Sequence, residues 1–295
     1  MVYDMMIRKK ALKIQERLGM RIGLPYGTAK LPTVRSVKDI AATFDVLYRI
    51  GMRAFVLPRE LFANIQSTTD LYKTHYGTLL KIRDLARKYN IELSLHHSAL
   101  SEHPDEELQT FAAIASVMGC RILAIHPSFY SRVLPKDQAL RLVGHKISEI
   151  SGNIRTKTPI GIETTGRAGE VGSVEDVLDL VTSTPGTEPV LNWAHIHARG
   201  NGMLKDQTRW RAVTEQVLSR GGRKWLSNAY FFFSGISYNQ QGELKHIPLA
   251  SSDLKLDMLV REVMSHDIKG TLILEDPDRD KFFVNILEAL ADMVR

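Results

Sequence analysis

Residues 160–163 read Ile-Gly-Ile-Glu, a short apolar run that ends on a side chain able to bind a metal ion. Three further runs end in the same way: Leu93-Ser94-Leu95-His96, Ile122-Leu123-Ala124-Ile125-His126 and Leu272-Ile273-Leu274-Glu275. Each run has the composition of a buried strand and is followed by loop residues and a segment with helical periodicity. Because the carboxyl ends of the strands share one face in a parallel βα fold, we expect the four polar side chains to converge there.

Strand-like and helix-like segments alternate along the whole chain. The expected strands are Arg21–Pro25, Ala54–Pro58, Ile91–His96, Arg121–His126, Ile160–Glu163, Val190–His195, Ala229–Gly235 and Thr271–Glu275. The expected helices include Val37–Ile50, Leu71–Tyr89, Asp105–Met118, Lys136–Arg155, Val174–Thr182, Asp253–His266 and Lys281–Val294. This order predicts an α/β protein, a single (β/α)8 TIM barrel over residues 21–295, preceded by a helical extension over residues 1–20. A doubly wound open sheet is the alternative, but the glycine-rich dinucleotide fingerprint is absent after the first strand.

Composition sets modest limits on the class of protein. With 44% hydrophobic residues among 295, the chain can bury a large core. The net charge of +6 suits an anionic partner such as nucleic acid, although the positive residues are spread out rather than gathered in a basic tail. The one cysteine, Cys120, excludes an internal disulfide. A single free cysteine favours a reducing cytoplasm, and we expect a cytoplasmic monomer. No apolar run has the length of a membrane span, so we expect no membrane partner.

The four strand-end side chains are two imidazoles and two carboxylates, a ligand set that suits a divalent transition metal. Any one of them alone is more simply explained as a hydrogen-bonded structural residue. His96 and His97 are adjacent, so on a strand they face opposite ways and only one of them enters the barrel mouth. Four such residues at equivalent positions favour a metal site, because polar groups at the carboxyl rim of a barrel are typical of function.

Two other regions add histidines. Asn192 and His195 lie where the sixth strand gives way to a loop and either both reach a metal, or His195 and His197 point the same way along a continuing strand. His246 follows the seventh strand and alone has the character of a surface residue. Glu243, three residues before it, adds a carboxylate if this loop bends inward.

These motifs resemble a known family. From about Arg21 to the C-terminus the chain is similar to endonuclease IV, the metal-dependent apurinic/apyrimidinic endonucleases of the xylose-isomerase-like barrel superfamily. The resemblance rests on the segments His96-His97-Ser98-Ala99-Leu100, His126-Pro127-Ser128, Ile162-Glu163-Thr164-Thr165-Gly166, Asn192-Trp193-Ala194-His195 and Leu274-Glu275. Typical members hold three zinc ions. The resemblance implies that His96 and His126 bind the first zinc, that Glu163 bridges the first and second, that Glu275 binds the second, and that His195 and His246 bind the third.

Three positions depart from the family pattern. Asn192 stands where the family has an aspartate on the second zinc, and Phe231 or Phe232, depending on register, stands where that zinc has a histidine. Leu244 stands where the third zinc has an aspartate. Only two of the family's four carboxylates remain, and uncompensated positive charge in a protein interior is costly. We therefore expect one or two zinc ions rather than three, with manganese or magnesium as alternatives.

The resemblance implies a metal-dependent hydrolase that cuts duplex DNA at abasic or damaged sites through a metal-bound hydroxide, with Glu163 and Glu275 as catalytic residues. Asn192 stays a candidate metal ligand because it lies three residues before His195, where both side chains can reach a metal. The candidate substrate-binding residues are Arg59, Leu100, Arg167 and Arg199.

Two alternatives to this function stay open. One is an isomerase or epimerase of a small sugar or sugar phosphate, which needs one metal and two acid/base groups. The other is a non-catalytic relative of the barrel.

Overall fold

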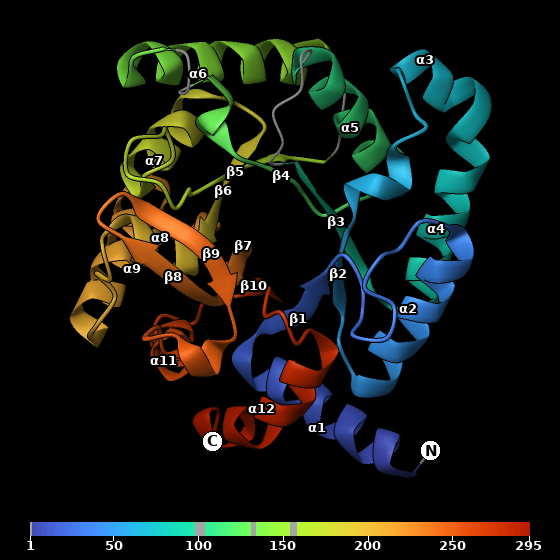
Figure 1. The fold of residues 1–295 in the computed structure, drawn as a ribbon, viewed down its shortest axis with the longest axis vertical. Coiled ribbons are helices and arrows are strands. Elements are labelled where there is room, and N and C mark those ends of the chain that lie inside the picture. Colours follow the sequence, from blue (N-terminus) through green and yellow to red (C-terminus); the bar gives the residue numbers. More distant parts are fainter. Residues whose placement is uncertain (1, 98–103, 131–133, 154–157) are drawn as a thin grey trace.

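A computed structural model describes residues 2–97, 104–130, 134–153 and 158–295. Its centre is a closed barrel of parallel strands, which confirms the predicted single (β/α)8 TIM barrel. Around the ring the order is β1, β10, β7, β6, β5, β4, β3 and β2, so each strand pairs with its sequence neighbours in the barrel (Figure 1). The barrel strands are β1 Met20–Pro25, β2 Ala54–Leu57, β3 Glu92–His97, β4 Leu123–Ile125, β5 Ile160–Glu163, β6 Thr187–Asn192, β7 Ala229–Phe233 and β10 Gly270–Leu274.

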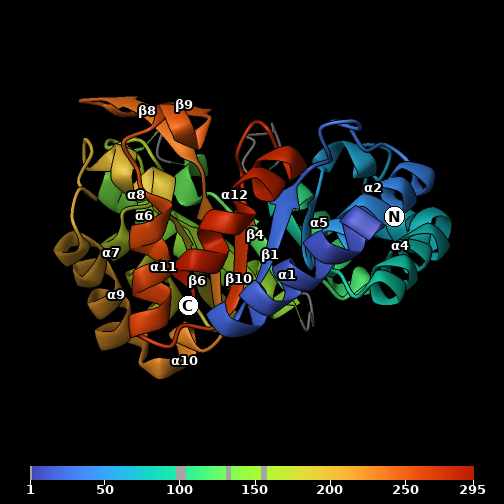
Figure 2. The same ribbon diagram turned by 90° about the horizontal axis from the view of Figure 1, so that it is seen from below.

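Helices surround the barrel in an outer layer. The longer ones are α1 Val2–Leu18, α2 Val37–Ile50, α4 Tyr76–Tyr89, α5 Pro104–Met118, α6 Lys136–Asn153, α7 Val174–Ser183, α9 Gln207–Gly221, α11 Leu256–Ser265 and α12 Asp280–Met293. Short helices are α3 Thr68–Asp70, α8 Trp193–Arg199 and α10 Arg223–Leu226. An antiparallel hairpin, β8 Gly235–Asn239 and β9 Gly242–Ile247, stands at one end of the barrel, opposite the end near α10 (Figure 2).

Local sequence explains where several helices begin and end. Ser36 precedes α2 and its side chain accepts a hydrogen bond from the backbone N–H of Asp39, while Gly51 ends the helix at a φ of 80°. Ser173 and Asp176 form a capping box at the start of α7. These caps satisfy backbone groups that have no partner inside the helix and so fix the loops at the strand ends.

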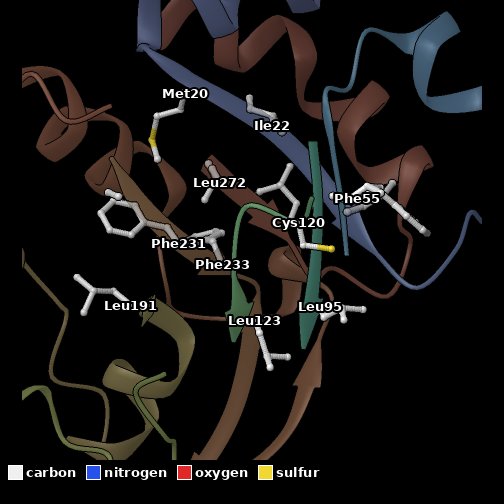
Figure 3. Packing of buried hydrophobic residues seen from close by; sticks show 14 of the residues in the cluster. Met20, Ile22, Phe55, Leu95, Cys120, Leu123, Leu191, Phe231, Phe233 and Leu272 are labelled. Carbon is white, nitrogen blue, oxygen red and sulfur yellow. The ribbon is translucent and has the colours of Figure 1, made fainter. Parts of the chain in front are cut away.

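Side chains alternate between the two faces of the barrel wall. Outward-facing residues such as Ile22, Leu95, Leu191 and Phe231 pack in the layer between strands and helices (Figure 3). The inward-facing set forms a separate cluster that fills the barrel: Ala54, Val56, Ile122, Ala124, Val190, Tyr230, Phe232 and Ile273. The barrel is therefore a packed core, and a site can form only at its rim. This alternation also settles the register of the seventh strand, because Phe232 faces the interior and Phe231 does not.

Several predicted boundaries are wrong; β4, for example, covers Leu123–Ile125 instead of Arg121–His126. β6 ends at Asn192 instead of His195, because Asn192 caps helix α8 by accepting a hydrogen bond from the His195 N–H. β7 ends at Phe233, and the chain then turns into the β8–β9 hairpin. The predicted helix from Leu71 begins as a π-helical turn, Leu71–His75, before α4. No helix in the described parts of the chain has the length and apolar character needed to cross a membrane.

Candidate metal centre

The four strand-end side chains meet at the carboxyl rim of the barrel. His96 lies on β3 and Glu163 ends β5, while His126 and Glu275 lie just after β4 and β10. Parallel pairing of neighbouring strands sets these positions side by side, with Ala124 opposite His96 and Gly161 opposite Ala124. Glu163 is only 1% exposed. A carboxylate buried to this extent needs a cation or several hydrogen-bond donors.

We call His96, His126 and Glu163 the first group. Their ligand atoms lie within 4.8 Å of one another. The Nε2 atom of His96 is 2.8 Å from Glu163 Oε2, and the Nε2 atom of His126 is 3.4 Å from Glu163 Oε1. Within the described chain, Glu163 Oε2 and the two Nε2 atoms are buried and have no partner with hydrogen-bond geometry. Two imidazoles and one carboxylate with buried, unsatisfied ligand atoms fit a divalent metal ion such as zinc.

Tyr26 orients the first histidine of this group. Its hydroxyl is 2.6 Å from His96 Nδ1, so the other ring nitrogen, Nε2, faces Glu163. Tyr26 follows β1 with a φ of 67°, a strained conformation for a bulky residue. Burial, with Glu275 and Glu163 nearby, raises the pKa of Tyr26 and keeps the phenol neutral. If Nδ1–H donates to the tyrosine oxygen, the lone pair of Nε2 is available to a metal. Tyr26 was not among the site residues predicted from the sequence.

The second group consists of His195, Glu243 and His246. Glu243 Oε2 and His246 Nε2 are each 3.4 Å from the Nε2 atom of His195. His195 Nδ1 lies 2.8 Å from the carbonyl oxygen of Thr164, to which it donates when Nε2 is unprotonated. Burial lowers the pKa of His195 to about 4, so its imidazole is neutral at pH 7, the form that binds metals. This group is a second set of two imidazoles and one carboxylate.

The β8–β9 hairpin brings Glu243 to the second group. The N–H of Glu243 donates to the carbonyl of Gly166 at 3.0 Å, and the N–H of Ala168 donates to the carbonyl of Gln241 at 3.1 Å. These bonds attach the hairpin to the loop after β5. Leu244, the next residue, is 60% exposed and points away. The inward bend that the sequence left open for Glu243 is thus present, in a hairpin that the strand pattern did not predict.

Asn192 lies between the two groups and belongs to neither. Its Nδ2 donates to Glu163 Oε1 at 3.0 Å and to Glu275 Oε2 at 3.1 Å. Glu275 Oε2 is also 3.8 Å from His246 Nδ1. Burial opposes ionisation of Glu163, but His96 and His126 outweigh it and hold the pKa of Glu163 well below its usual range. Burial and the charge of Glu163 raise the pKa of Glu275, so the pKa of Glu275 lies above that of Glu163.

The other predicted site residues have separate positions. Phe232 packs below the first group, with its ring 5.4 Å from that of His96. His197 faces away from both groups and lies 3.0 Å from Asp253, so the reading of His195 and His197 on one continuing strand is wrong. His97 also faces away and stacks on Phe111, as the alternation at His96 predicted. Leu100 and the neighbouring Ala99 lie outside the described residues.

The three predicted arginines differ in what they contact. Arg59 pairs with Glu107 and lines a cavity of about 500 Å³ beside Tyr26 and His96. Arg199 donates to the backbone carbonyls of residues 165, 167, 168 and 170, so its guanidinium holds the loop after β5. Arg167 lies 3.7 Å from Glu170 of the same loop and has a side chain that is 58% exposed. Only Arg59 and Arg167 therefore have a surface available to a substrate.

Comparisons with known proteins agree with this fold. A family model described as xylose isomerase-like TIM barrel matches residues 44–293. An uncharacterized protein of Methanocaldococcus jannaschii, MJ0133, is 24% identical over 265 residues, which are 88% of this chain and 94% of that protein. Endonuclease IV from Thermus thermophilus superposes with a TM-score of 0.63 at 16% identity, over 92% of this chain and 99% of its own. A D-tagatose 3-epimerase-like protein gives 0.62 at 13% identity, over 93% and 97%.

Proposed function

The chain belongs to the family of xylose isomerase-like TIM barrels, and on this basis we propose that it is a metal-dependent phosphodiesterase that cuts DNA at abasic sites. The observation that carries the proposal is the pair of adjoining ligand groups at the rim. Each group offers two imidazoles and one carboxylate, which suits zinc better than magnesium. His126 and His195 connect the groups, with ring centroids 5.5 Å apart. Two neighbouring ions are typical of enzymes that hydrolyse phosphate esters.

Divalent ions bound to the two groups would supply Lewis acidity, lowering the pKa of water and offsetting the charge of a phosphate. The protein's own residues hold and orient the reactants. Tyr26 and the Thr164 carbonyl fix the ring orientations of His96 and His195. Glu275 reaches the gap between the two groups, where its carboxylate can accept the proton of the attacking water. Arg167, on the exposed rim, is the cation that we assign to the DNA backbone.

A second candidate substrate is a small sugar or sugar phosphate. The cavity beside His96 favours it, because about 500 Å³ is large enough for such a molecule and the lining includes Tyr26, Arg35, Arg59 and Glu60. An isomerase also needs two free acid/base groups. Glu163 is instead held by His96, His126 and Asn192 within the first group, which leaves Glu275 as the one carboxylate beside it for acid/base work and favours the phosphodiesterase.

The test is incubation of zinc-loaded protein with duplex DNA that contains one abasic site. We expect metal-dependent nicking at the lesion, which is absent with chelator and on undamaged duplex. Glu163→Gln should remove the activity, whereas His145→Gln, an exposed histidine on α6, should leave it unchanged. Zinc-loaded protein that leaves the abasic duplex intact and instead interconverts ketohexoses would contradict the proposal and support the sugar reading.

A further inference from the structure

We propose that the side-chain amide of Asn192 takes the place of a cation between two buried carboxylates and thereby limits the centre to two metal ions. The inference rests on the proposed two-ion centre but not on the identity of the substrate. It assigns Asn192 the role of determining how many ions bind, rather than that of a metal ligand.

The orientation of the amide is fixed by the helix that begins there. Oδ1 of Asn192 accepts a hydrogen bond from the His195 N–H at 3.2 Å, the N-cap interaction of α8. The Nδ2 atom must therefore face the other way, toward Glu163 and Glu275. With the oxygen occupied by the helix cap, Asn192 presents only N–H donors to the carboxylates.

The two hydrogens of Nδ2 match the two carboxylates. Glu163 Oε1 is 3.0 Å away and Glu275 Oε2 is 3.1 Å away, whereas the third neighbour, His195 Nε2, is farther at 3.4 Å, so each carboxylate accepts one N–H. Two buried carboxylates that share one neighbouring atom repel each other, and a cation is the usual way to hold them together. The amide provides partial positive charge at the same place and adds no net charge. A third ion would have to displace it.

The residue beneath this position does not provide a ligand either. Phe232 is fully buried in the barrel interior, pairs in register with Asn192 and packs against His96. An ion between Glu163 and Glu275 would therefore meet an apolar ring below and amide hydrogens at the side. Neither group stabilises a divalent cation.

Asn192→Asp should convert this arrangement into a third ion site. A carboxylate oxygen in place of Nδ2 would lie about 3 Å from one oxygen of each glutamate. Oxygens that share an ion at about 2.0–2.2 Å lie roughly 3.0–3.5 Å apart, so the new oxygen would lie at about ligand spacing from one oxygen of each glutamate. We expect zinc-reconstituted, desalted protein to contain two equivalents of zinc per chain, and Asn192→Asp to contain three.

The matched control is Asn228→Asp, which adds the same charge at an exposed residue just before β7, at the other end of that strand from the rim. It should keep two equivalents. Three equivalents in the unsubstituted protein, or two in folded Asn192→Asp, would overturn the inference. Two equivalents without nicking of abasic DNA would contradict only the proposed function.

A second variant tests the amide without adding a ligand. Asn192→Ser retains an N-cap side chain but cannot reach both carboxylates. In chelator, we expect its unfolding temperature to fall by about 2–4 °C for each hydrogen bond lost. An unchanged unfolding temperature would show that the amide does not hold the two carboxylates together and would refute the proposal even if Asn192→Asp does not fold.

Discussion

At the scale of single residues, the contact between Tyr26 and His96 determines which ring nitrogen of His96 faces Glu163. Tyr26→Phe removes the hydroxyl that lies 2.6 Å from Nδ1, so the ring can rotate and change tautomer. We expect zinc affinity to fall about 10–100-fold, as when the outer partner of a ligand histidine is lost. Competition with a coloured chelator measures it. Tyr72→Phe, at an exposed tyrosine, is the control, and equal affinities in both variants would contradict the role of Tyr26.

His195 predicts how the stability of the metal-free protein varies with pH. Its pKa falls from 6.5 to about 4 on burial, so the unfolded chain binds a proton first as the pH decreases. The contribution of this histidine is therefore complete above pH 6.5 and is lost as the pH falls toward 4. Between pH 7 and pH 4.5 we expect the free energy of unfolding to fall by about 2–3 kcal/mol because of this one group. Urea unfolding in chelator should give a correspondingly weaker pH dependence for His195→Gln, and equal dependence would exclude the burial effect.

Some residues of the site could be predicted from the sequence and others could not. His96, His126, Glu163 and Glu275 were predictable because parallel strands place their last residues on one face. Tyr26 was not, because its position depends on a left-handed backbone conformation after β1 that alternation does not encode. The bridge made by Asn192 was also hidden, since it requires knowing that the amide oxygen caps a helix.

At the scale of elements, the hairpin β8–β9 and the loop after β5 form one unit. Gly166 and Gly242 allow their backbones to touch, and a Cβ on Gly166 would lie 2.6 Å from Glu243 Cβ. Arg199 holds the loop from the other side through backbone carbonyls. Strand periodicity did not predict the hairpin, because it lies outside the barrel sheet and its register is set by these loop contacts.

Gly166→Ala tests this unit. The added methyl group should push Glu243 out of the second group, so we expect bound zinc to fall from two equivalents to one while the first group stays loaded. Gly169→Ala is a matched control in the same loop, because its Cβ would meet nothing within 4 Å. Retention of both equivalents in Gly166→Ala would show that the glycine contact does not determine the position of Glu243.

At the scale of the whole molecule, the net charge of +6 distinguishes the two candidate substrates. Binding to duplex DNA releases counterions, so catalytic efficiency on abasic DNA should fall at least tenfold between 50 and 200 mM salt if about two or more phosphates are contacted. Efficiency on a small neutral sugar should barely change. Steady-state assays across this range measure the difference, and a salt-independent efficiency on DNA would argue against a duplex substrate.

The two ion groups are also built on parts of the molecule with different local stability. The first group stands on β3, β5 and the end of β4, strands that are paired on both sides within the closed barrel. The second draws Glu243 and His246 from a two-stranded hairpin that is not part of that barrel. Opening of such a peripheral hairpin costs less than unfolding of the barrel. The second ion should therefore exchange with the surroundings much faster than the first, so that metal supply in the cell sets how much of the protein is fully loaded at any moment.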